Sequence, residues 1–237
     1  GNFEPFYKEV FKRIKDNKSN TLILDLRDNP GGRLSEINLL YSFVADSSIA
    51  FVDKSEVASK TSFFKRDYFG GGLAINFAKT LAYPFYASYV YLKVKKEDGK
   101  YYFASSENKA KPLLENRFKG KMYVLIDGGS FSASSIISSN LKGSGRATFV
   151  GEETGGAYNG TVAGQMPTVE LPNSKVKIRV GLMKIAAHFK TDEEGHGIRP
   201  DIEIISTLED KISGNDPEMN WILENIKIIQ LFCVGYL

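Results

Sequence analysis

The sequence of 237 residues is poor in several residue types, and each scarcity excludes a class of protein. Its single cysteine, Cys233, cannot form a disulfide within the chain, so cysteine usage indicates neither a disulfide framework nor a compartment. Its formal net charge is only +3, from 31 basic and 28 acidic residues, which is too balanced to indicate a nucleic-acid partner. No apolar run reaches the roughly 20 residues of a membrane-spanning helix. No signal peptide is visible, and because the first residue is Gly1 rather than Met, we expect further sequence upstream.

The residues that are present have ordinary proportions for a globular protein, with 42% hydrophobic and 25% charged residues. An amphipathic helix is predicted over residues 5–15, from apolar side chains at helical spacing. A buried strand over 21–26, a glycine turn over 27–32 and a second helical pattern over 34–44 follow. The same order returns over 122–142 as a strand, a turn and a helix. This repeated strand–turn–helix unit predicts an α/β fold.

Three segments are predicted from these patterns. Residues 1–46 and 121–237 form two parts of one core, and residues 47–120 form an insertion that is partly β. In the insertion, an alternating strand over Tyr89–Val94 is expected to pair with Lys100–Phe103. Further elements are predicted downstream: a hairpin of Val169–Leu171 with Val176–Val180, a strand over Lys184–Phe189, and a helix over Pro217–Gln230 capped by Asp216.

The two glycine turns are where chemistry is expected, because α/β proteins bind ligands at the carboxyl ends of strands. The second turn places Ser132 at a helix N-terminus, whose free N–H groups would stabilise an oxyanion. In the first turn, Gly31 and Gly32 leave backbone N–H groups uncovered by side chains. A simpler reading is also open, because the six serines between Ser130 and Ser139 are equally typical of helix caps and small packing residues.

Four segments resemble, in the same order, the motifs of one family. That family is the C-terminal processing, or tail-specific, serine peptidases, which include the tricorn protease core. The segments are Leu24–Gly32 (LDLRDNPGG), Gly129–Ser135 (GSFSASS), Gly145–Gly156 (GRATFVGEETGG) and Gly195–Asp201 (GHGIRPD).

The resemblance implies a crotonase- and ClpP-like α/β core with Ser132 as the nucleophile. It implies an oxyanion hole formed by the amide of Ala133 and that of either Gly31 or Gly32. The expected partner is a polypeptide substrate, bound near its C-terminus by addition of a strand to a sheet edge. Neither a cofactor nor a metal site is expected. Members of the family are usually exported, so an extracytoplasmic location, periplasmic or at the cell surface, is expected.

The sequence departs from the tail-specific branch at the general base. That branch has a lysine where this chain has Ala157, so a serine–lysine dyad of that geometry is excluded. The tricorn-like branch uses a histidine that precedes a PDZ domain, together with a glutamate just before the GxGIxPD-type turn. Glu194 occupies that glutamate position, although it also belongs to an acidic turn. The resemblance therefore predicts a histidine and a PDZ-like module upstream of Gly1.

Within the chain, the candidates for the base are weak. His196 lies beside Glu194 and is the better of only two histidines, while His188 is expected on the face of a strand. Lys142 and Lys184 would serve only if they were buried, and solvated faces are their more ordinary location.

Two other functions remain open. The chain could belong to a non-catalytic relative that binds peptides or other ligands and has lost its base. It could also be a crotonase-like enzyme acting on a thioester, because similar oxyanion holes serve both chemistries, but nothing specifically signals a coenzyme A pocket.

Overall fold

The computed structural model describes residues 2–63, 73–226 and 233–234. The chain forms two compact units. Unit 1 comprises residues 1–51, 109–160 and 187–237, and unit 2 comprises residues 52–108 and 161–186. In the described part of the chain, no helix combines the length and the apolar character needed to cross a bilayer.

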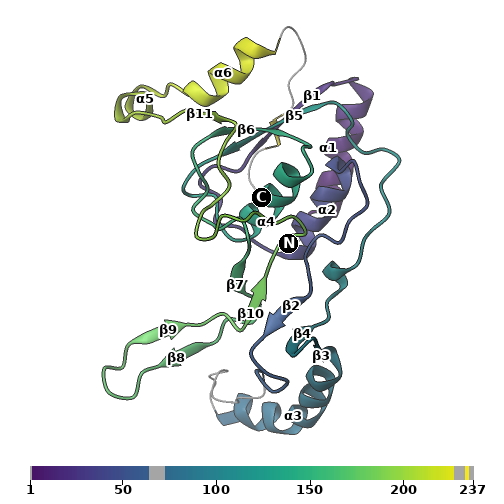
Figure 1. Cartoon of the computed structure of the whole chain (residues 1–237), viewed down its shortest axis with the longest axis vertical. Coiled ribbons are helices and arrows are strands. Elements are labelled where there is room, and N and C mark those ends of the chain that lie inside the picture. Colours follow the sequence, from purple (N-terminus) through teal and green to yellow (C-terminus); the bar gives the residue numbers. More distant parts are fainter. Residues whose placement is uncertain (1, 64–72, 227–232, 235–237) are drawn as a thin grey trace. The chain divides into compact units, whose positions relative to one another are not determined.

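Unit 1 is built on a parallel sheet with the strand order β11-β6-β5-β1-β12 (Figure 1). The central strands β1 and β5 pair in register, with Ile23 opposite Tyr123. Both are almost wholly buried, as expected for parallel strands covered on both faces. The strands are β1 (Thr21–Asp25), β5 (Lys121–Ile126), β6 (Thr148–Gly151), β11 (Ile202–Glu203) and β12 (Cys233–Val234).

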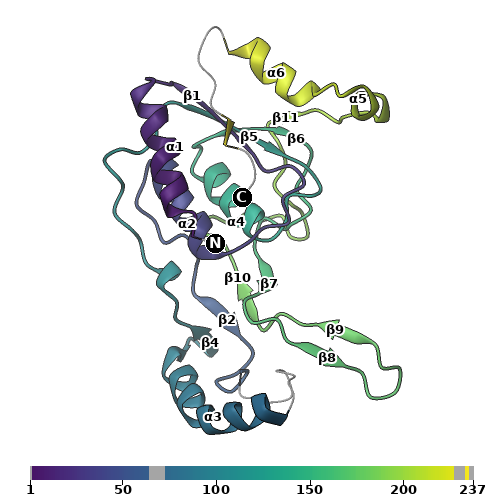
Figure 2. The same ribbon diagram turned by 180° about the vertical axis from the view of Figure 1, so that it is seen from behind.

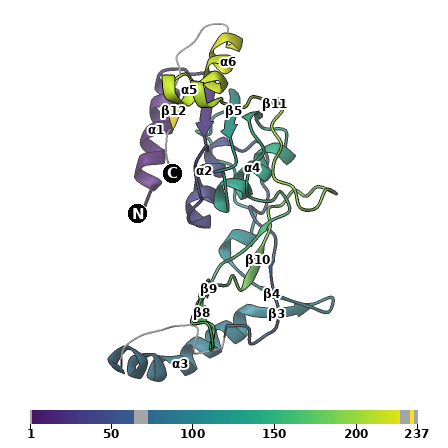
Figure 3. The same cartoon turned by 90° about the vertical axis from the view of Figure 1, so that its left-hand side faces the viewer.

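Helices cover the two faces of this sheet. Ile23 and Leu125 pack with Ile222 of the C-terminal helix α6 on one face. Side chains alternate along a strand, so Leu24 and Val124 point to the other face, where α2 and α4 lie together (Figure 3). The helices of unit 1 are α1 (Glu4–Asp16), α2 (Leu34–Val44), α4 (Ala133–Gly143), α5 (Leu208–Ser213) and α6 (Pro217–Asn225).

The predicted repeated strand–turn–helix unit, and with it the α/β fold class, is confirmed by β1–α2 and β5–α4. The first helix is confirmed as α1, which buries Tyr7, Phe11 and Ile14. The cap of the last helix is also confirmed, because the Asp216 side chain accepts a hydrogen bond of 2.9 Å from the N–H of Met219. That helix ends at Asn225, and most of its predicted extension lies outside the described residues.

Unit 2 contains an antiparallel sheet with the order β3-β4-β2-β10-β7 and a separate two-stranded hairpin, β8-β9 (Figure 2). Its small core contains Val57, Phe63, Val90 and Val94. The elements are β2 (Ser55–Val57), α3 (Leu73–Lys93), β3 (Val94–Glu97), β4 (Lys100–Phe103), the 3₁₀ helix η2 (Ser106–Asn108), β7 (Thr161–Ala163), β8 (Thr168–Glu170), β9 (Lys177–Arg179) and β10 (Met183–Ile185).

Two strand predictions are wrong in their extent. The predicted strand over Tyr89–Val94 is the last turn of α3 followed by the first residue of β3; only the hairpin with Lys100–Phe103 is confirmed. Val90, near the end of α3, and Val94, the first residue of β3, both pack in the core, so the alternation of residues over 89–94 spans the boundary between a helix and a strand. The strand predicted over Lys184–Phe189 ends at Ile185 as β10, so His188 lies beyond it. The glycine triplet at 70–72 lies outside the described residues.

Candidate active site

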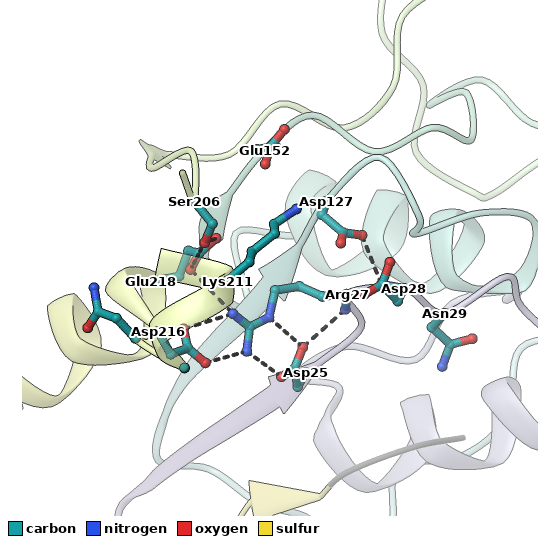
Figure 4. Close-up of a pocket in the computed structure, with 12 residues that line it drawn as sticks. Asp25, Arg27, Asp28, Asn29, Asp127, Glu152, Ser206, Lys211, Asp216 and Glu218 are labelled. Carbon is teal, nitrogen blue, oxygen red and sulfur yellow. Dashed lines mark hydrogen bonds and ion pairs between the residues drawn. The ribbon is translucent and has the colours of Figure 1, made fainter. Parts of the chain in front are cut away.

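The two glycine turns of unit 1 follow β1 and β5 and are joined by hydrogen bonds. The N–H of Asp28 donates to Oδ1 of Asp127 over 2.9 Å, as Figure 4 shows. The N–H of Phe131 donates to the carbonyl oxygen of Asn29 over 3.0 Å. Parallel strands end at the same edge of a sheet, so two segments a hundred residues apart form one surface there.

Gly31 brings the first turn against the second. A Cβ atom placed on Gly31 would lie 2.5 Å from the nitrogen of Ala133 and 3.0 Å from Cβ of Ser132. Gly31 also has a φ of +92°, which side chains rarely adopt. A Cβ on the neighbouring Gly32 would meet no atom within 4 Å. The close packing and the backbone conformation at position 31 therefore both require glycine. Neither requires it at position 32.

Ser132 stands at the sharp turn between β5 and α4 with φ 54° and ψ −113°. A helix N-cap residue ordinarily has an extended backbone and accepts a hydrogen bond through its side chain, but Ser132 does neither. Such a conformation costs about 1–3 kcal/mol and is concentrated at functional sites. A serine held on a strained strand-to-helix turn presents its hydroxyl outward.

The backbone N–H groups of the two turns differ in whether they make a hydrogen bond. The N–H of Gly31 donates to Oδ1 of Asn29 over 2.9 Å. Neither the N–H of Gly32 nor that of Ala133, the first residue of α4, makes a hydrogen bond within the described part of the chain. Of the two glycines that the sequence leaves as alternatives, Gly32 is the one with a free donor.

The other serines of this segment have ordinary structural roles. Ser130 is fully buried, and its hydroxyl donates to the carbonyl oxygen of Leu26 over 2.7 Å. The hydroxyls of Ser135 and Ser139 donate to the carbonyl oxygens of Ser130 and Ser135. The packing interpretation therefore holds for these serines, whereas Ser132 is half-buried and its side chain makes no such bond.

The third and fourth motifs meet the nucleophile segment at the same place. The N–H of Gly156 donates to the carbonyl oxygen of Ser130 over 3.2 Å. Ala157 forms an isolated antiparallel bridge with Gly197, and the hydroxyl of Thr154 accepts a hydrogen bond of 2.8 Å from the N–H of Ile198. All four motifs therefore converge in unit 1, although they are spread over residues 24–201 of the sequence.

Glu194 lies on the outer side of this convergence. Its Oε1 accepts a hydrogen bond of 3.1 Å from Nδ2 of Asn159, and the same amide nitrogen donates to the carbonyl oxygen of Thr191. The carboxylate is exposed, and no hydrogen bond among the described residues joins it to Ser132. Its proposed role in orienting the site stays a prediction.

His196 is occupied by other partners. Its Nδ1 lies 3.4 Å from Oε1 of Glu153 and 3.3 Å from Nη2 of Arg199. Glu153 also accepts a hydrogen bond of 2.6 Å from the N–H of Gly197, and this bond, aided by the charges of His196 and Arg199, lowers the pKa of the Glu153 carboxyl below its ordinary value. No hydrogen bond within the described ranges joins His196 to Ser132 or Glu194.

The remaining candidate bases are either exposed or held by another partner. Lys142 pairs with Asp201, which also accepts a hydrogen bond from the N–H of Phe149. Lys184 and His188 are exposed, and the backbone N–H of His188 donates to the side chain of Asn140. Lys184 belongs to unit 2, whereas Ser132 belongs to unit 1.

Two charged residues of the site were not identified from the sequence. Oδ1 of Asp127 accepts hydrogen bonds from the N–H groups of Gly129 and Ser130 as well as that of Asp28. One carboxylate oxygen thus fastens both turns. The pattern Asp-Gly-Gly-Ser is a turn signal that would have indicated this role.

The second is Arg27, which ties the first turn to α6 (Figure 4). Its guanidinium donates two hydrogen bonds of 2.8 Å to Asp216 and two, of 2.7 and 3.1 Å, to Asp25. It also donates a longer one, of 3.4 Å, to the buried carboxylate of Glu218. The bonds from Arg27 lower the pKa of Asp216. These residues line a cavity of about 400 Å³. In the described ranges, no group of three or more histidine, cysteine, aspartate or glutamate side chains is arranged to hold a metal ion.

Comparison with sequence families identifies the class of protein that this geometry serves. Residues 2–204 match peptidase family S41, and the chain belongs to that family. The curated carboxy-terminal-processing protease of Bartonella bacilliformis is 27% identical over 209 residues, which is 88% of this chain and 36% of that protein. The chain therefore spans about a third of the length of that relative.

Two solved structures share the fold. One is the structure of mature CPAF complexed with lactacystin. The match covers 95% of this chain and 48% of the CPAF chain, with a TM-score of 0.59 and 16% identity. The other is a structure from Parabacteroides merdae ATCC 43184. That match covers 94% of this chain and 57% of the other chain, with a TM-score of 0.55 and 18% identity. At such identities the likeness concerns the fold alone.

Proposed function

We propose that the protein containing this chain is a serine peptidase that cleaves polypeptides near their C-termini, with Ser132 as the nucleophile. The single observation that carries the proposal is the close approach of Gly31 to Ser132 and Ala133, which brings the first turn against the strained turn of Ser132. Among the described residues, the N–H groups of Gly32 and Ala133 in these two turns make no hydrogen bond. A nucleophile beside two donor amides is the arrangement that acyl transfer needs. Membership of peptidase family S41 supports the same chemistry.

In the proposed reaction, Ser132 attacks the scissile carbonyl carbon and forms a tetrahedral intermediate. The N–H groups of Ala133 and Gly32 donate to its oxyanion. The general base takes the proton of the Ser132 hydroxyl and gives it to the amine that leaves when the intermediate collapses. Water, deprotonated by the same base, then releases the acyl group and restores the serine hydroxyl. Removing one such donor typically lowers kcat by about 10²–10³-fold.

The general base is proposed to be a histidine outside these 237 residues. Ala157 stands where the tail-specific branch has lysine, His196 binds Glu153 and Arg199, and Lys142 binds Asp201. Glu194 is proposed to orient or charge-stabilise the site, as in the tricorn-like branch. We also propose an extracytoplasmic location, because the sequence resembles a family whose members are usually exported.

The test uses the full-length protein and a fluorophosphonate probe, which labels an activated serine. We expect covalent labelling of the wild type and none of the Ser132→Ala variant. Ser138→Ala is the matched control, because Ser138 lies in α4, which follows Ser132, and its buried hydroxyl has no hydrogen-bond partner among the residues that the structure describes. Labelling should survive in this control, since removing an unpaired buried hydroxyl leaves no partner unsatisfied.

A second candidate function is a non-catalytic peptide-binding relative, which the alanine at position 157 favours. It predicts that the folded full-length protein binds peptides but is labelled at neither serine. Absence of labelling in a protein whose thermal unfolding is cooperative would overturn the peptidase proposal in favour of this one.

A further inference from the structure

A cavity of unit 1 lies at the opposite end of the central strands from Ser132. Its walls include residues 18–20, which directly precede β1, and residues 115–120, which directly precede β5. Because β1 and β5 are parallel, this cavity is at their amino ends, whereas the two glycine turns are at their carboxyl ends. The cavity is therefore separate from the proposed peptidase site.

Positive charge gathers at this cavity. Four of the side chains that line it are cationic, and a single one, Glu115, is anionic. The cations are Lys15, Lys18, Arg117 and Lys119. Elsewhere on α1, Lys8 and Lys12 form ion pairs with acidic residues of the same helix. None of the four cations at the cavity forms an ion pair within the described part of the chain.

The guanidinium of Arg117 has few acceptors for its five N–H donors. Its Nη1 donates one hydrogen bond of 3.3 Å to the carbonyl oxygen of Leu114. Its Nε is buried without a hydrogen-bond partner among the described residues, and so is Oγ of Ser19, which also belongs to the cavity wall. Buried polar atoms without partners are uncommon in folded proteins, and a bound water or ion is one of the usual reasons for them.

The charge of Arg117 also acts on a neighbouring guanidinium. Burial lowers the pKa of Arg146, and the positive charge of Arg117 lowers it further, against the attraction of Asp46. Arg146 donates hydrogen bonds to the carbonyl oxygens of Phe118 and Gly120, which are residues of the cavity wall. Two like charges therefore lie near each other beside the cavity, and an anion next to Arg117 would reduce their repulsion.

The cavity also has an apolar wall and room for more than a single ion. Phe11, Ile14 and Phe118 line it, and each is at most 5% exposed. Its volume is about 370 Å³, which lies within the range of small-molecule sites. A phosphoryl group carries several acceptor oxygens and a multiple negative charge, and guanidinium and ammonium groups are its usual partners in proteins. The walls of the cavity therefore fit a phosphoryl group with an apolar group attached to it.

We propose that this cavity binds a small phosphorylated ligand, with Arg117, Lys18 and Lys119 around the phosphoryl oxygens and the apolar part of the ligand against Phe118. The inference does not rest on the proposed peptidase function, because the cavity shares no residue with the turns that hold Ser132.

The experiment is a calorimetric titration of the full-length protein at constant ionic strength. The probes are phenyl phosphate, inorganic phosphate and phenol. We expect saturable binding of phenyl phosphate to one site, with a Kd about tenfold or more below that of inorganic phosphate because the ring loses its contact with water. Phenol lacks the phosphoryl group and should show no saturable binding at the same concentrations.

Three variants locate the binding. Arg117→Gln should raise the Kd of phenyl phosphate by about tenfold or more, because hydrogen bonds between charged groups are the strong ones. Lys119→Gln removes an exposed charge and should raise it by about threefold. Arg179→Gln, on the exposed strand β9 of unit 2, is the matched control for Arg117→Gln and should leave the Kd unchanged. Thermal unfolding without ligand checks that each variant is folded, and Lys119→Gln still tests the site if Arg117→Gln does not fold.

Vesicles distinguish a free ligand from a lipid headgroup. Sedimentation with phosphatidylglycerol vesicles that Arg117→Gln abolishes would identify the source as a lipid. Binding of phenyl phosphate without sedimentation would identify a free phosphorylated molecule, and both results support the phosphoryl site. The proposal is overturned if phenyl phosphate shows no saturable binding, or if Arg117→Gln and Arg179→Gln change its Kd equally.

Discussion

The β1–α2 and β5–α4 units have the same order of strand, glycine turn and helix, yet their turns are built differently. In the first, Asn29 captures the N–H of Gly31 and the backbone comes close to Ala133 without any side chain between. In the second, Asp127 gathers three N–H groups and the backbone at Ser132 is strained.

The difference shows how one local arrangement can supply two unlike chemical parts. The first turn offers a backbone donor, the N–H of Gly32, and the neighbouring Gly31 lets this turn approach Ala133 without a side chain between them. The second offers a side-chain hydroxyl, which needs a sharp bend so that it projects from the start of a helix. A site of this kind depends on the two turns being held together, and the following predictions test that dependence.

The largest effect is expected from Gly31→Ala. The added methyl group would collide with the nitrogen of Ala133, and alanine at a φ of +92° is strained. We expect the rate of probe labelling to fall by about 10²-fold or more, as for loss of an oxyanion donor, together with a lower free energy of unfolding.

Gly32→Ala is the matched control for this change. Its added methyl group meets no atom within 4 Å, and Gly32 is not among the residues with positive φ. The free energy of unfolding, measured by urea titration, should stay within about 0.5 kcal/mol of the wild type. If Gly31→Ala and Gly32→Ala lowered the free energy of unfolding equally, this result would contradict the close packing of the two turns at Gly31.

A smaller effect is expected from Asp127→Ala. This change leaves the N–H groups of Asp28 and Gly129 without their acceptor, whereas the N–H of Ser130 keeps the backbone carbonyl oxygen of residue 127. The loss should cost about 1–3 kcal/mol of stability. Because the two turns would separate, kcat should fall by about tenfold or more while KM changes less.

Asp127→Asn should restore most of the activity, since its side-chain oxygen can still accept all three hydrogen bonds. The measurement is kcat and KM for one peptide in both variants of the full-length protein. Wild-type kcat in a folded Asp127→Ala variant would show that this carboxylate does not position the turns.

The smallest effect concerns the attachment of the first turn to α6 through Arg27. Hydrogen bonds from Arg27 lower the pKa of Asp216 relative to the unfolded chain, where aspartate titrates near pH 3.9. The ionised carboxylate therefore stabilises the fold above about pH 4, and this contribution is lost as the pH falls through the folded pKa.

Asp216→Asn isolates the charge, because asparagine also caps helices well. Since the Asp216 side chain is 38% exposed, we expect a loss below about 1 kcal/mol at pH 7 and a flatter acid limb of stability. Urea titrations at several pH values measure both. An unchanged acid limb would exclude Asp216 as a contributor.

Much of unit 1 could be predicted because its signals are local. The strands β1 and β5 are short apolar runs that end in glycine turns, and each is followed by apolar residues at helical spacing. The α3 helix could not be separated from a strand within a six-residue window rich in tyrosine and valine, since both types favour strands. Val90 packs with Val57 and Phe63 in the core of unit 2, and contacts with such distant residues are not visible within this window.

The residues of the site also fall into those that local sequence could predict and those that it could not. The two turns and Ser132 carry local signals, so the resemblance could indicate them. Sequence could not show which N–H groups of Gly31 and Gly32 are already hydrogen-bonded, or which partners His196 has. These features depend on the positions of side chains, some of which lie tens of residues away. The cavity beside Arg117 requires the end of α1 and residues 115–120 to come together, which no motif records.

The central claim is tested most directly by the crystal structure of the full-length protein with a peptidyl boronic acid, which forms a tetrahedral adduct with an active serine. We predict a bond from boron to Oγ of Ser132, with one boronate oxygen about 2.7–3.1 Å from the nitrogens of both Gly32 and Ala133. An adduct on Ser132 whose oxygens receive a hydrogen bond from neither amide would contradict it.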